Sequence, residues 1–221
     1  IGRIKTLCSK NVYFMGAPPP HHLSSVKSHE GESELVLQCV MVPAINTINI
    51  LYVNKLRGVM KKSAKVEIII VGNEILTGDI SDTNTNWLCR LVHGRGGVVN
   101  RVTVVPDVLD VVAEAVRAAV SRQVDILFTS GGLGPTSDDL TLQAVANGTD
   151  RDVVLHEEAL ELVRQQYDRF FEQGIMTQGG LNPARQKMAC LPIGGEPLIN
   201  PEGTAPGVFL QVEKTTMISV P

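Results

Sequence analysis

Aromatic side chains are scarce in this chain, because Phe, Trp and Tyr together make up 4% of its 221 residues. Basic residues are not in excess either, since the formal net charge is −3. A basic stripe interleaved with aromatic residues, the usual signature of a nucleic-acid-binding surface, is therefore absent. We expect no nucleic-acid partner.

Two further features are absent. The four cysteines, Cys8, Cys39, Cys89 and Cys190, show no C-x-x-C spacing, which excludes the common zinc and redox motifs. Scattered cysteines of this kind are typical of reduced thiols, so we expect a cytoplasmic protein. No apolar run reaches the roughly 18 residues that a membrane-spanning helix needs, and we expect no membrane partner.

The first 62 residues differ from the rest of the chain. Residues 1–60 hold six basic and three acidic residues, whereas 61–221 hold fourteen basic and twenty acidic ones. The early segment also contains a Pro-Pro-Pro-His-His run and no sustained helical or strand period. We expect a leader or extension over 1–62, with Met60 as the natural start, or alternatively an organellar presequence. The domain then covers 63–221, and its end directly after a strand predicts a C-terminally truncated fold.

The most informative stretch lies between Asp125 and Leu140. A buried strand opens into a glycine-rich turn, and a helix is expected to start at Thr136. Glycine adopts positive φ and lets backbone N–H groups approach a ligand, while a helix N-terminus favours an anion. The pattern predicts a phosphate-binding turn whose substrate contacts are Ser130, Gly131, Gly132, Gly134, Pro135 and Thr136.

Two acids follow this turn at once. The carboxylates of Asp138 and Asp139 would repel a phosphate, unless a divalent cation lies between them. Mg²⁺ is commonly held by one or two carboxylates together with substrate phosphates. We therefore predict a metal site, for Mg²⁺ or a similar ion, at Asp138 and Asp139. The alternative is a capping box between Thr136 and Asp139, which explains one carboxylate without a ligand.

Other polar residues follow the predicted strands at the sheet edge where open α/β folds bind ligands. Glu74 follows a strand over 65–71, and Asp107 follows a strand over 98–105. Glu74 is alternatively an exposed loop acid, and Asp107 alternatively the N-cap of the next helix. Asn84 lies among several capping candidates, of which we expect one to cap and the others to remain available to a ligand.

One arginine is a candidate phosphate ligand. Arg185 follows a turn marked by Pro183, and its planar fork can bind a phosphate bidentately, whereas Lys187 acts only as a point charge. The alternative for Arg185 is a solvent-exposed side chain.

The strands and helices alternate along the chain. Strands are predicted at 65–71, 98–105, 126–130, 153–154, 208–212 and 217–220, and helices at 87–94, 108–120, 139–146 and 156–173. Such β-α units in series predict an α/β fold, a three-layer α/β/α sandwich with a mostly parallel sheet.

These motifs resemble the MoaB/Mog-type molybdopterin-binding domain, and within that superfamily the N-terminal domain of competence/damage-inducible protein A (CinA). The matching stretches, in consistent order, are 71–78, 82–84, 105–107, 130–141, 182–185 and 200–207. In the molybdenum-cofactor branch a Thr stands where this glycine turn has Leu133. The Leu133-Gly134-Pro135-Thr136 form is that of CinA-like proteins.

The resemblance implies metal-dependent hydrolysis of ADP-ribose, or a related dinucleotide, to AMP and ribose 5-phosphate. It implies catalytic acids at Asp139, Asp107 and Glu74, and substrate contacts at Asn84, Arg185 and Thr204 besides those of the glycine turn. Two alternatives remain: molybdopterin binding or adenylylation, and a non-catalytic ligand-binding or oligomerisation module. The implied partner is a small nucleotide or pterin that carries phosphates, and the relatives imply a homo-oligomer.

Overall fold

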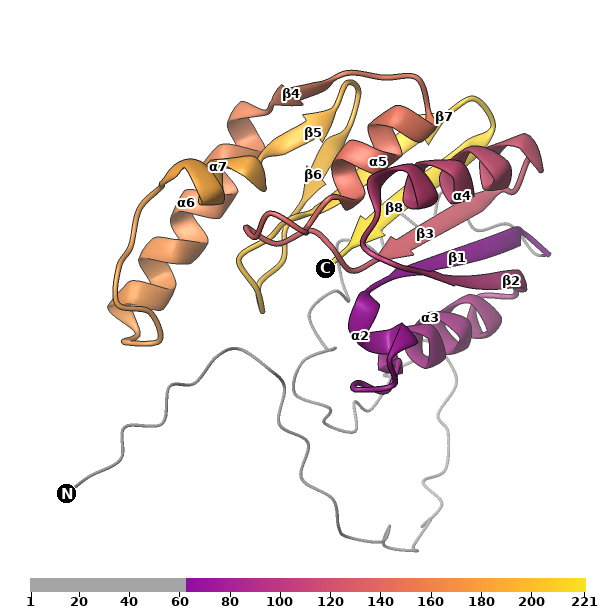
Figure 1. Cartoon of the computed structure of the whole chain (residues 1–221), viewed down its shortest axis with the longest axis horizontal. Coiled ribbons are helices and arrows are strands. Elements are labelled where there is room, and N and C mark those ends of the chain that lie inside the picture. The colour runs from indigo at the N-terminus through magenta and orange to yellow at the C-terminus, as the bar shows by residue number, and fades with distance from the viewer. Residues whose placement is uncertain (1–62) are drawn as a thin grey trace, which may run out of the picture. The chain divides into compact units, whose positions relative to one another are not determined.

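A six-stranded sheet in the order β2-β1-β3-β8-β7-β6 forms the centre of the fold (Figure 1). The structure is a computed structural model that describes residues 63–221, so the expectations for 1–62 lie outside the described residues. The large sheet consists of β1 (Lys65–Val71), β2 (Val98–Val105), β3 (Ile126–Ser130), β6 (Glu196–Leu198), β7 (Gly207–Val212) and β8 (Thr215–Val220). Strands β2, β1, β3 and β8 run parallel, while β7 is antiparallel to both of its neighbours.

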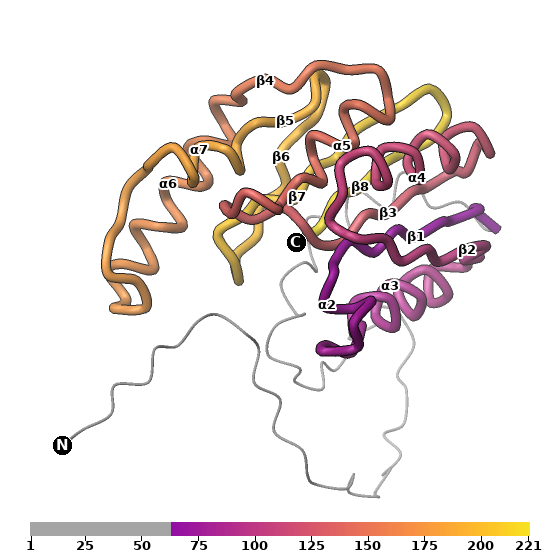
Figure 2. Tube along the Cα trace, viewed as in Figure 1, coloured from indigo at the N-terminus to yellow at the C-terminus, as the bar shows by residue number. Residues whose placement is uncertain are grey.

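Helices cover both faces of this sheet (Figures 1 and 2). On one face lie α2 (Asn73–Leu76) and α3 (Thr83–Gly94), and on the other lie α4 (Leu109–Ser121) and α5 (Thr141–Gly148). A smaller antiparallel ribbon pairs β4 (Val153–Leu155) with β5 (Cys190–Pro192). The helices α6 (Glu157–Glu172) and α7 (Pro183–Lys187) pack beside the ribbon. In the part of the chain that the structure describes, no helix combines the length and the apolarity that crossing a bilayer requires.

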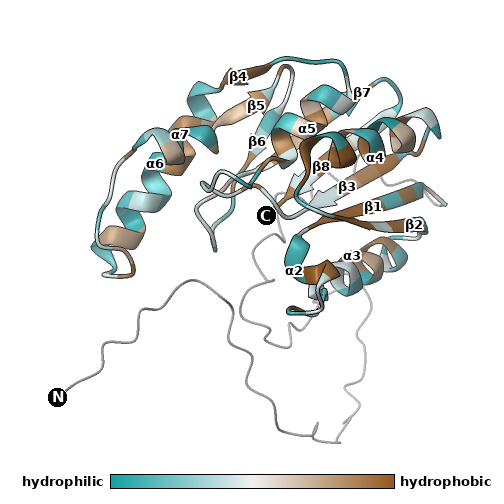
Figure 3. Cartoon of the chain, in the orientation of Figure 1, coloured by the Kyte–Doolittle hydropathy of each residue, from teal (hydrophilic) through white to brown (hydrophobic). Residues whose placement is uncertain are grey.

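The β1 strand shows why the fold has three layers. Successive side chains of a strand point to opposite faces, and β1 is apolar on both. Ile68 packs in a cluster with Leu88 of α3, whereas Ile69 packs in a cluster with Val112 of α4. A nearly continuous apolar strand is typical of a parallel sheet that is covered on both sides, and β1 is accordingly mostly hydrophobic in Figure 3. The predicted α/β/α sandwich with a mostly parallel sheet is confirmed.

The helix after the glycine turn starts later than predicted. We expected a helix start at Thr136, but 136–140 form an irregular turn and α5 begins at Thr141. The N–H of Thr141 donates to Gly132 O at 3.1 Å, and its hydroxyl donates to Gly131 O at 2.8 Å. The glycine turn therefore holds the first residue of α5, and Asp138 and Asp139 lie in the loop before the helix.

Several short elements were not predicted. The elements α2, α7, β5 and β6 were not among those predicted, and β8 begins at Thr215 instead of the predicted Met217. None of the four missed elements exceeds five residues, so none is long enough to show a clear hydrophobic period. The strands β7 and β8 form a hairpin, with Val212 paired to Thr215.

A buried ion pair lies away from the glycine turn, between the start of β1 and the end of α4. Glu67 is 4% exposed and interrupts the apolar run of β1. Arg122 donates to both of its carboxylate oxygens, at 2.8 and 2.6 Å. The carboxylate raises the pKa of Arg122, first through the hydrogen bond and then through its charge, while burial opposes the shift.

Replacing Arg122 tests this pair. Arg122→Met leaves a buried carboxylate without its cation, which costs about 3 to 5 kcal/mol in a fully buried pair. Because the Arg122 side chain is 39% exposed and water can replace it in part, we expect a loss of about 1 to 2 kcal/mol in urea unfolding. Arg164→Met is the control and should have little effect, because Arg164 forms exposed pairs with Glu161 and Asp168. Equal losses in the two variants would contradict a special role of the buried pair.

Candidate functional site

The candidate site lies at the carboxyl edge of the parallel strands, where the loops after β1, β2 and β3 meet. Gly131 N–H donates to Val220 O at 3.1 Å, which joins the glycine turn to the end of β8. Asn73 N–H donates to Asp107 Oδ2 at 2.8 Å, which joins the loops after β1 and β2. The loop between β6 and β7 lies at the same edge, because β7 begins beside the end of β8. Open α/β sheets bind ligands at this edge.

The glycine turn requires glycine at two consecutive positions. Gly131 has φ +97°, and a Cβ there would lie 2.1 Å from the carbonyl oxygen of Val71. Gly132 has φ +67°, and a Cβ there would lie 2.3 Å from Thr141 Oγ1. The turn thus packs directly against the backbone of β1 and against the start of α5, with no room for a side chain. Backbone N–H groups at such a turn are well placed to approach an anion.

Asp139 closes the glycine turn. Its Oδ2 accepts from the N–H of Thr136 at 2.9 Å and from the Thr136 hydroxyl at 2.6 Å. A Cβ on Gly134 would lie 2.6 Å from the same oxygen, so this glycine leaves space for the carboxylate. The contact is one half of the capping box that we considered, yet no helix begins at Thr136. Oδ1 of Asp139 takes no part in the hydrogen bonds of residues 63–221.

Asp138 is exposed beside it. The nearby Thr136 side chain lowers the pKa of this carboxyl most, although its hydroxyl proton is donated to Asp139 Oδ2 at 2.6 Å, and the backbone N–H of Asp138 and the charge of Lys187 lower the pKa further. Asp138 therefore keeps its negative charge to a lower pH than a free aspartate does. The charged carboxylate of Asp138 and the free Oδ1 of Asp139 thus belong to consecutive residues next to the turn.

The two basic residues of α7 lie in different environments. Arg185 donates to the carbonyl oxygens of Gln178, Gly179 and Gly180, and its guanidinium lies 3.9 Å from the centre of the Tyr167 ring. Its fork is thus engaged in holding the 178–180 loop, and it is not the solvent-exposed side chain that we weighed as an alternative. Lys187 reaches the glycine turn, where its ammonium group donates to Thr136 O. The cation beside the turn is Lys187.

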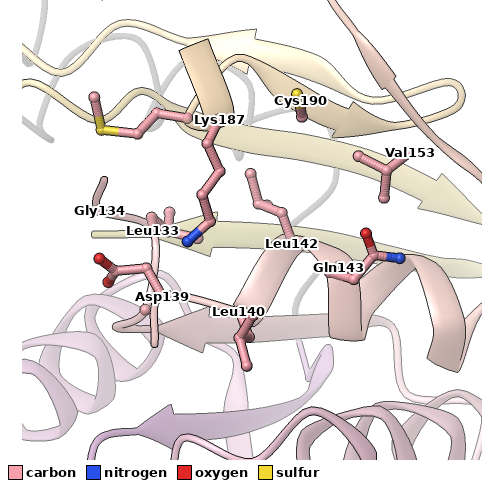
Figure 4. Close-up of a pocket in the computed structure, with 11 residues that line it drawn as sticks. Leu133, Gly134, Asp139, Leu140, Leu142, Gln143, Val153, Lys187 and Cys190 are labelled. Carbon is pink, nitrogen blue, oxygen red and sulfur yellow. The ribbon is translucent and has the colours of Figure 1, made fainter. Parts of the chain in front are cut away.

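A cavity of about 140 Å³ adjoins the glycine turn (Figure 4). Asp139 and Gly134 lie at one end, Gln143 and Val153 lie towards the other, and Lys187 projects between them. Its eleven lining residues are Gly132, Leu133, Gly134, Asp139, Leu140, Leu142, Gln143, Val153, Lys187, Met188 and Cys190. The cavity therefore joins a charged end, made by the turn, to a mainly aliphatic interior.

The other candidate acids lie along the same sheet edge. Glu74 is exposed, and a Cβ on Gly72 would lie 2.9 Å from its Oε1, so its carboxylate folds back over the end of β1. Asp107 Oδ2 accepts from the N-terminus of α2, and Val108 occupies the N-cap of α4. The alternative of Asp107 as the N-cap of the helix that follows it was wrong, because its carboxylate turns towards β1.

The remaining predicted contacts are divided between two places. Asn84 Nδ2 donates to Ser130 Oγ at 2.8 Å, which brings the start of α3 to the end of β3, while Asp82 is the residue that caps α3. Thr204 lines a separate cavity of about 110 Å³ with Gln166 of α6, and it is not among the residues around the cavity at the glycine turn. Pro135 lies within the turn, half-buried.

The described residues constrain how a metal ion can bind. Within 63–221, no group of three or more His, Cys, Asp or Glu side chains is arranged to hold an ion. A site made by protein ligands alone is therefore not formed by this part of the chain. Mg²⁺ needs fewer protein ligands, because it takes phosphate oxygens and water for the rest, and Asp139 Oδ1 with Asp138 fits that requirement. The predicted metal site stays a prediction.

The position of Lys187 at the turn and the interior of the cavity were not predicted from the sequence. Lys187 and Arg185 are two residues apart on a short helix, so spacing alone gives no reason to prefer either of them. The lining residues Gln143, Val153 and Met188 come from α5, β4 and the end of α7, which are brought together only by the packing of the β4-β5 ribbon. No local signal in the sequence identifies them.

Known proteins are similar over the described domain. A protein of Pyrococcus horikoshii is 42% identical over 155 residues, which are 70% of this chain and 61% of that protein. A protein of Aeropyrum pernix is 43% identical over 162 residues, which are 73% of this chain and 58% of that protein. The chain thus spans about three fifths of the length of these relatives.

A solved structure and a family model agree with this similarity. The crystal structure of CinA from Thermoplasma acidophilum, described as a protein of unknown function, matches with a TM-score of 0.63 at 36% identity, over 70% of this chain and 87% of that one. The resemblance to CinA and to the MoaB/Mog type that the motifs predicted is confirmed. Residues 67–221 match the family model of the probable molybdopterin-binding domain, and the chain therefore belongs to that family.

Proposed function

We propose that this domain is a metal-dependent hydrolase of a nucleotide pyrophosphate, with ADP-ribose or a related dinucleotide as its substrate. The observation that supports this proposal is the meeting of the glycine turn, Lys187 and Asp139 in one cavity. The turn and Lys187 would bind the negative oxygens of a phosphate, whereas the Asp139 carboxylate would repel them. A cation that binds together with the substrate would remove this repulsion, because it would lie between the carboxylate and the phosphate.

Three kinds of group would bind the phosphates of the substrate. The N–H groups of Gly131 and Thr136 are already hydrogen-bonded within the protein, so the other backbone N–H groups of the glycine turn would approach the ligand, and Lys187 would add a positive charge. The N–H of Thr141, the first residue of α5, donates to Gly132 O, but α5 has no side-chain N-cap, so the N–H groups that follow in its first turn are available to an anion. Arg185 has a different part in this scheme: it holds the 178–180 loop and so supports α7, on which Lys187 lies.

The acids would divide the remaining tasks. Asp139 Oδ1 and Asp138 would hold the cation, which would offset the charge on the phosphoryl oxygens. Glu74 has a carboxylate that is not hydrogen-bonded within the described residues, so it is better suited than Asp107 to orient an attacking water. The water oxygen would bond to one phosphorus and give a proton to the Glu74 carboxylate, the bridging P–O bond would break, and the bridging oxygen would leave with the other phosphate.

The direct test is an assay for AMP and ribose 5-phosphate. Purified protein is incubated with ADP-ribose in Mg²⁺ or Mn²⁺, and a parallel sample contains EDTA. We expect both products in equal amounts with the metal and none with EDTA. Absence of turnover with either metal, from a folded protein, would overturn the proposal.

The family match favours a second candidate function, the binding or adenylylation of molybdopterin. The same glycine turn and cavity would then hold the phosphate of the pterin. Tight binding of molybdopterin by a protein that does not hydrolyse ADP-ribose would favour this function over the first.

The contrast between Lys187 and Arg185 gives a prediction for this site. Lys187→Met should raise KM for ADP-ribose by about 10- to 100-fold, the value of one hydrogen bond to a charged group, with little change in stability. Arg185→Met should instead lower the unfolding free energy by about 1 to 3 kcal/mol, because three carbonyl groups lose their donor. Steady-state kinetics and urea unfolding of both variants separate these effects. A larger rise in KM in Arg185→Met than in Lys187→Met would show that Arg185, and not Lys187, contacts the phosphate.

A further inference from the structure

The cavity beside the glycine turn has an interior that the phosphate chemistry does not use. Beyond Asp139 and Lys187 its walls are mainly aliphatic, formed by Leu133, Leu142 and Met188 together with Val153. Leu133 and Met188 belong to the buried cluster that joins the turn to α6 and α7, so these walls are held in place by core packing. Water in such a space has few polar partners, and displacing it with an apolar group is favourable.

The size of the cavity restricts what can enter. An engineered cavity of about 150 Å³ lined by aliphatic and aromatic residues binds benzene. At about 140 Å³ this cavity has room for a six-membered aromatic ring. A fused second ring would extend from the cavity towards its opening.

One polar group lies at the end of the cavity away from Asp139. Gln143 is exposed on α5, and its Nε2 donates to Asn147 Oδ1 at 3.0 Å. That contact fixes the amide and leaves its carbonyl oxygen as an acceptor. An amino group on a heteroaromatic ring is a donor that this oxygen can accept, and a purely hydrocarbon ring offers none.

From these observations we propose that the cavity is the subsite for the flat heteroaromatic base of the ligand, which lies between Leu142 and Met188 with its amino group on Gln143. The inference rests on the proposed function, since it assumes that the phosphates lie at the glycine turn. It names the recognised chemistry as an amino-substituted ring joined to a phosphate, which adenine nucleotides and pterin phosphates share.

Cys190 provides a probe of this subsite in the unaltered protein. It lines the cavity, and burial raises the pKa of its thiol, so labelling with iodoacetamide is best done at alkaline pH. AMP at about ten times its Kd should slow Cys190 labelling about tenfold, because only the free protein then reacts. Ribose 5-phosphate and pyrophosphate, which lack the ring, should slow it less than about twofold. Cys89, which is not among the cavity residues, is the internal reference when labelling is followed by mass spectrometry.

The labelling results separate the two proposals. Protection by AMP supports the subsite with an adenine ligand. Protection by a pterin monophosphate alone supports the subsite and overturns ADP-ribose as the substrate. Equal labelling with and without both ring compounds overturns the subsite, even if ADP-ribose is hydrolysed.

A pair of substitutions on β4 gives an independent test. Val153 lines the cavity, whereas Val154 points to the opposite face of the strand and is 44% exposed. Val153→Phe should fill the space and weaken AMP binding at least about tenfold, with pyrophosphate binding changed less than about twofold. Val154→Phe should leave both affinities unchanged. If Val153→Phe does not fold, Gln143→Met on the exposed face of α5 takes its place, with about a fivefold loss of AMP affinity expected for one hydrogen bond. Unchanged AMP affinity in the folded variant would overturn the subsite.

Discussion

Asp139→Asn should reduce metal-dependent hydrolysis of ADP-ribose by about 100- to 1000-fold, mainly in kcat. The substitution keeps the size of the side chain and removes its charge, so a cation beside the phosphates loses its main protein ligand. Part of the activity should return at higher Mn²⁺ concentration, because the ion can still bind through the phosphates and Asp138. The measurement is kcat and KM as a function of metal concentration.

The fold of this variant should survive. An Asn oxygen can accept the N–H of Thr136 as Oδ2 of Asp139 does, and we expect a loss of about 1 kcal/mol or less in unfolding free energy. Asp150→Asn is the matched control, since Asp150 is an exposed acid at the other end of α5 with φ +53°, a conformation that Asn tolerates. An Asp139→Asn protein that unfolds early but retains its turnover would show that the carboxylate only stabilises the turn.

Gly131→Ala should be the most destabilising of the substitutions considered, by about 3 to 5 kcal/mol. Two effects add: the residue has φ +97°, and the new Cβ would lie 2.1 Å from the carbonyl oxygen of Val71. Because the end of β1 is packed on both sides, the turn must move to relieve this contact. Phosphate binding should therefore weaken even in molecules that remain folded.

Gly174→Ala separates the two effects. Gly174 has φ +71°, but no described atom lies within 4 Å of its Cβ position. It should lose only about 1 to 2 kcal/mol, the cost of a left-handed conformation for alanine. Urea unfolding and isothermal titration with pyrophosphate measure both variants. Equal losses would mean that the close approach to β1 contributes nothing.

The sequence predicted the central sheet well, for a physical reason. Strands that are covered on both faces must be apolar at most positions, and β1, with five apolar residues among its seven, shows this most clearly. Their helices are long enough to show an apolar face. Short elements such as α7 and β5 have too few residues to show a hydrophobic period, so the sequence did not predict them. The start of α5 was also not predicted, because it depends on Thr141, which contacts the carbonyl groups of Gly131 and Gly132.

The residues of the candidate site were only partly accessible to sequence reasoning. Glu74, Asp107 and Gly131 follow strands, and the carboxyl ends of parallel strands meet at one edge, so the order of strands and loops predicted their common location. The roles of Arg185 and Lys187, in contrast, could not be predicted from the sequence. The two residues share a helix, and the 178–180 loop and the Tyr167 ring, which lie next to one of them, decide which is free to reach the turn.

The amino-acid sequence by itself determined the α/β class, the glycine turn and the acids beside it, because each depends on a local run of residues. Only the tertiary structure decided that Lys187 is the cation at the turn, that Thr204 lies in another cavity, and that an aliphatic space adjoins the glycine turn. These features join side chains from elements far apart in the chain, and their contacts exist only after those elements have packed together.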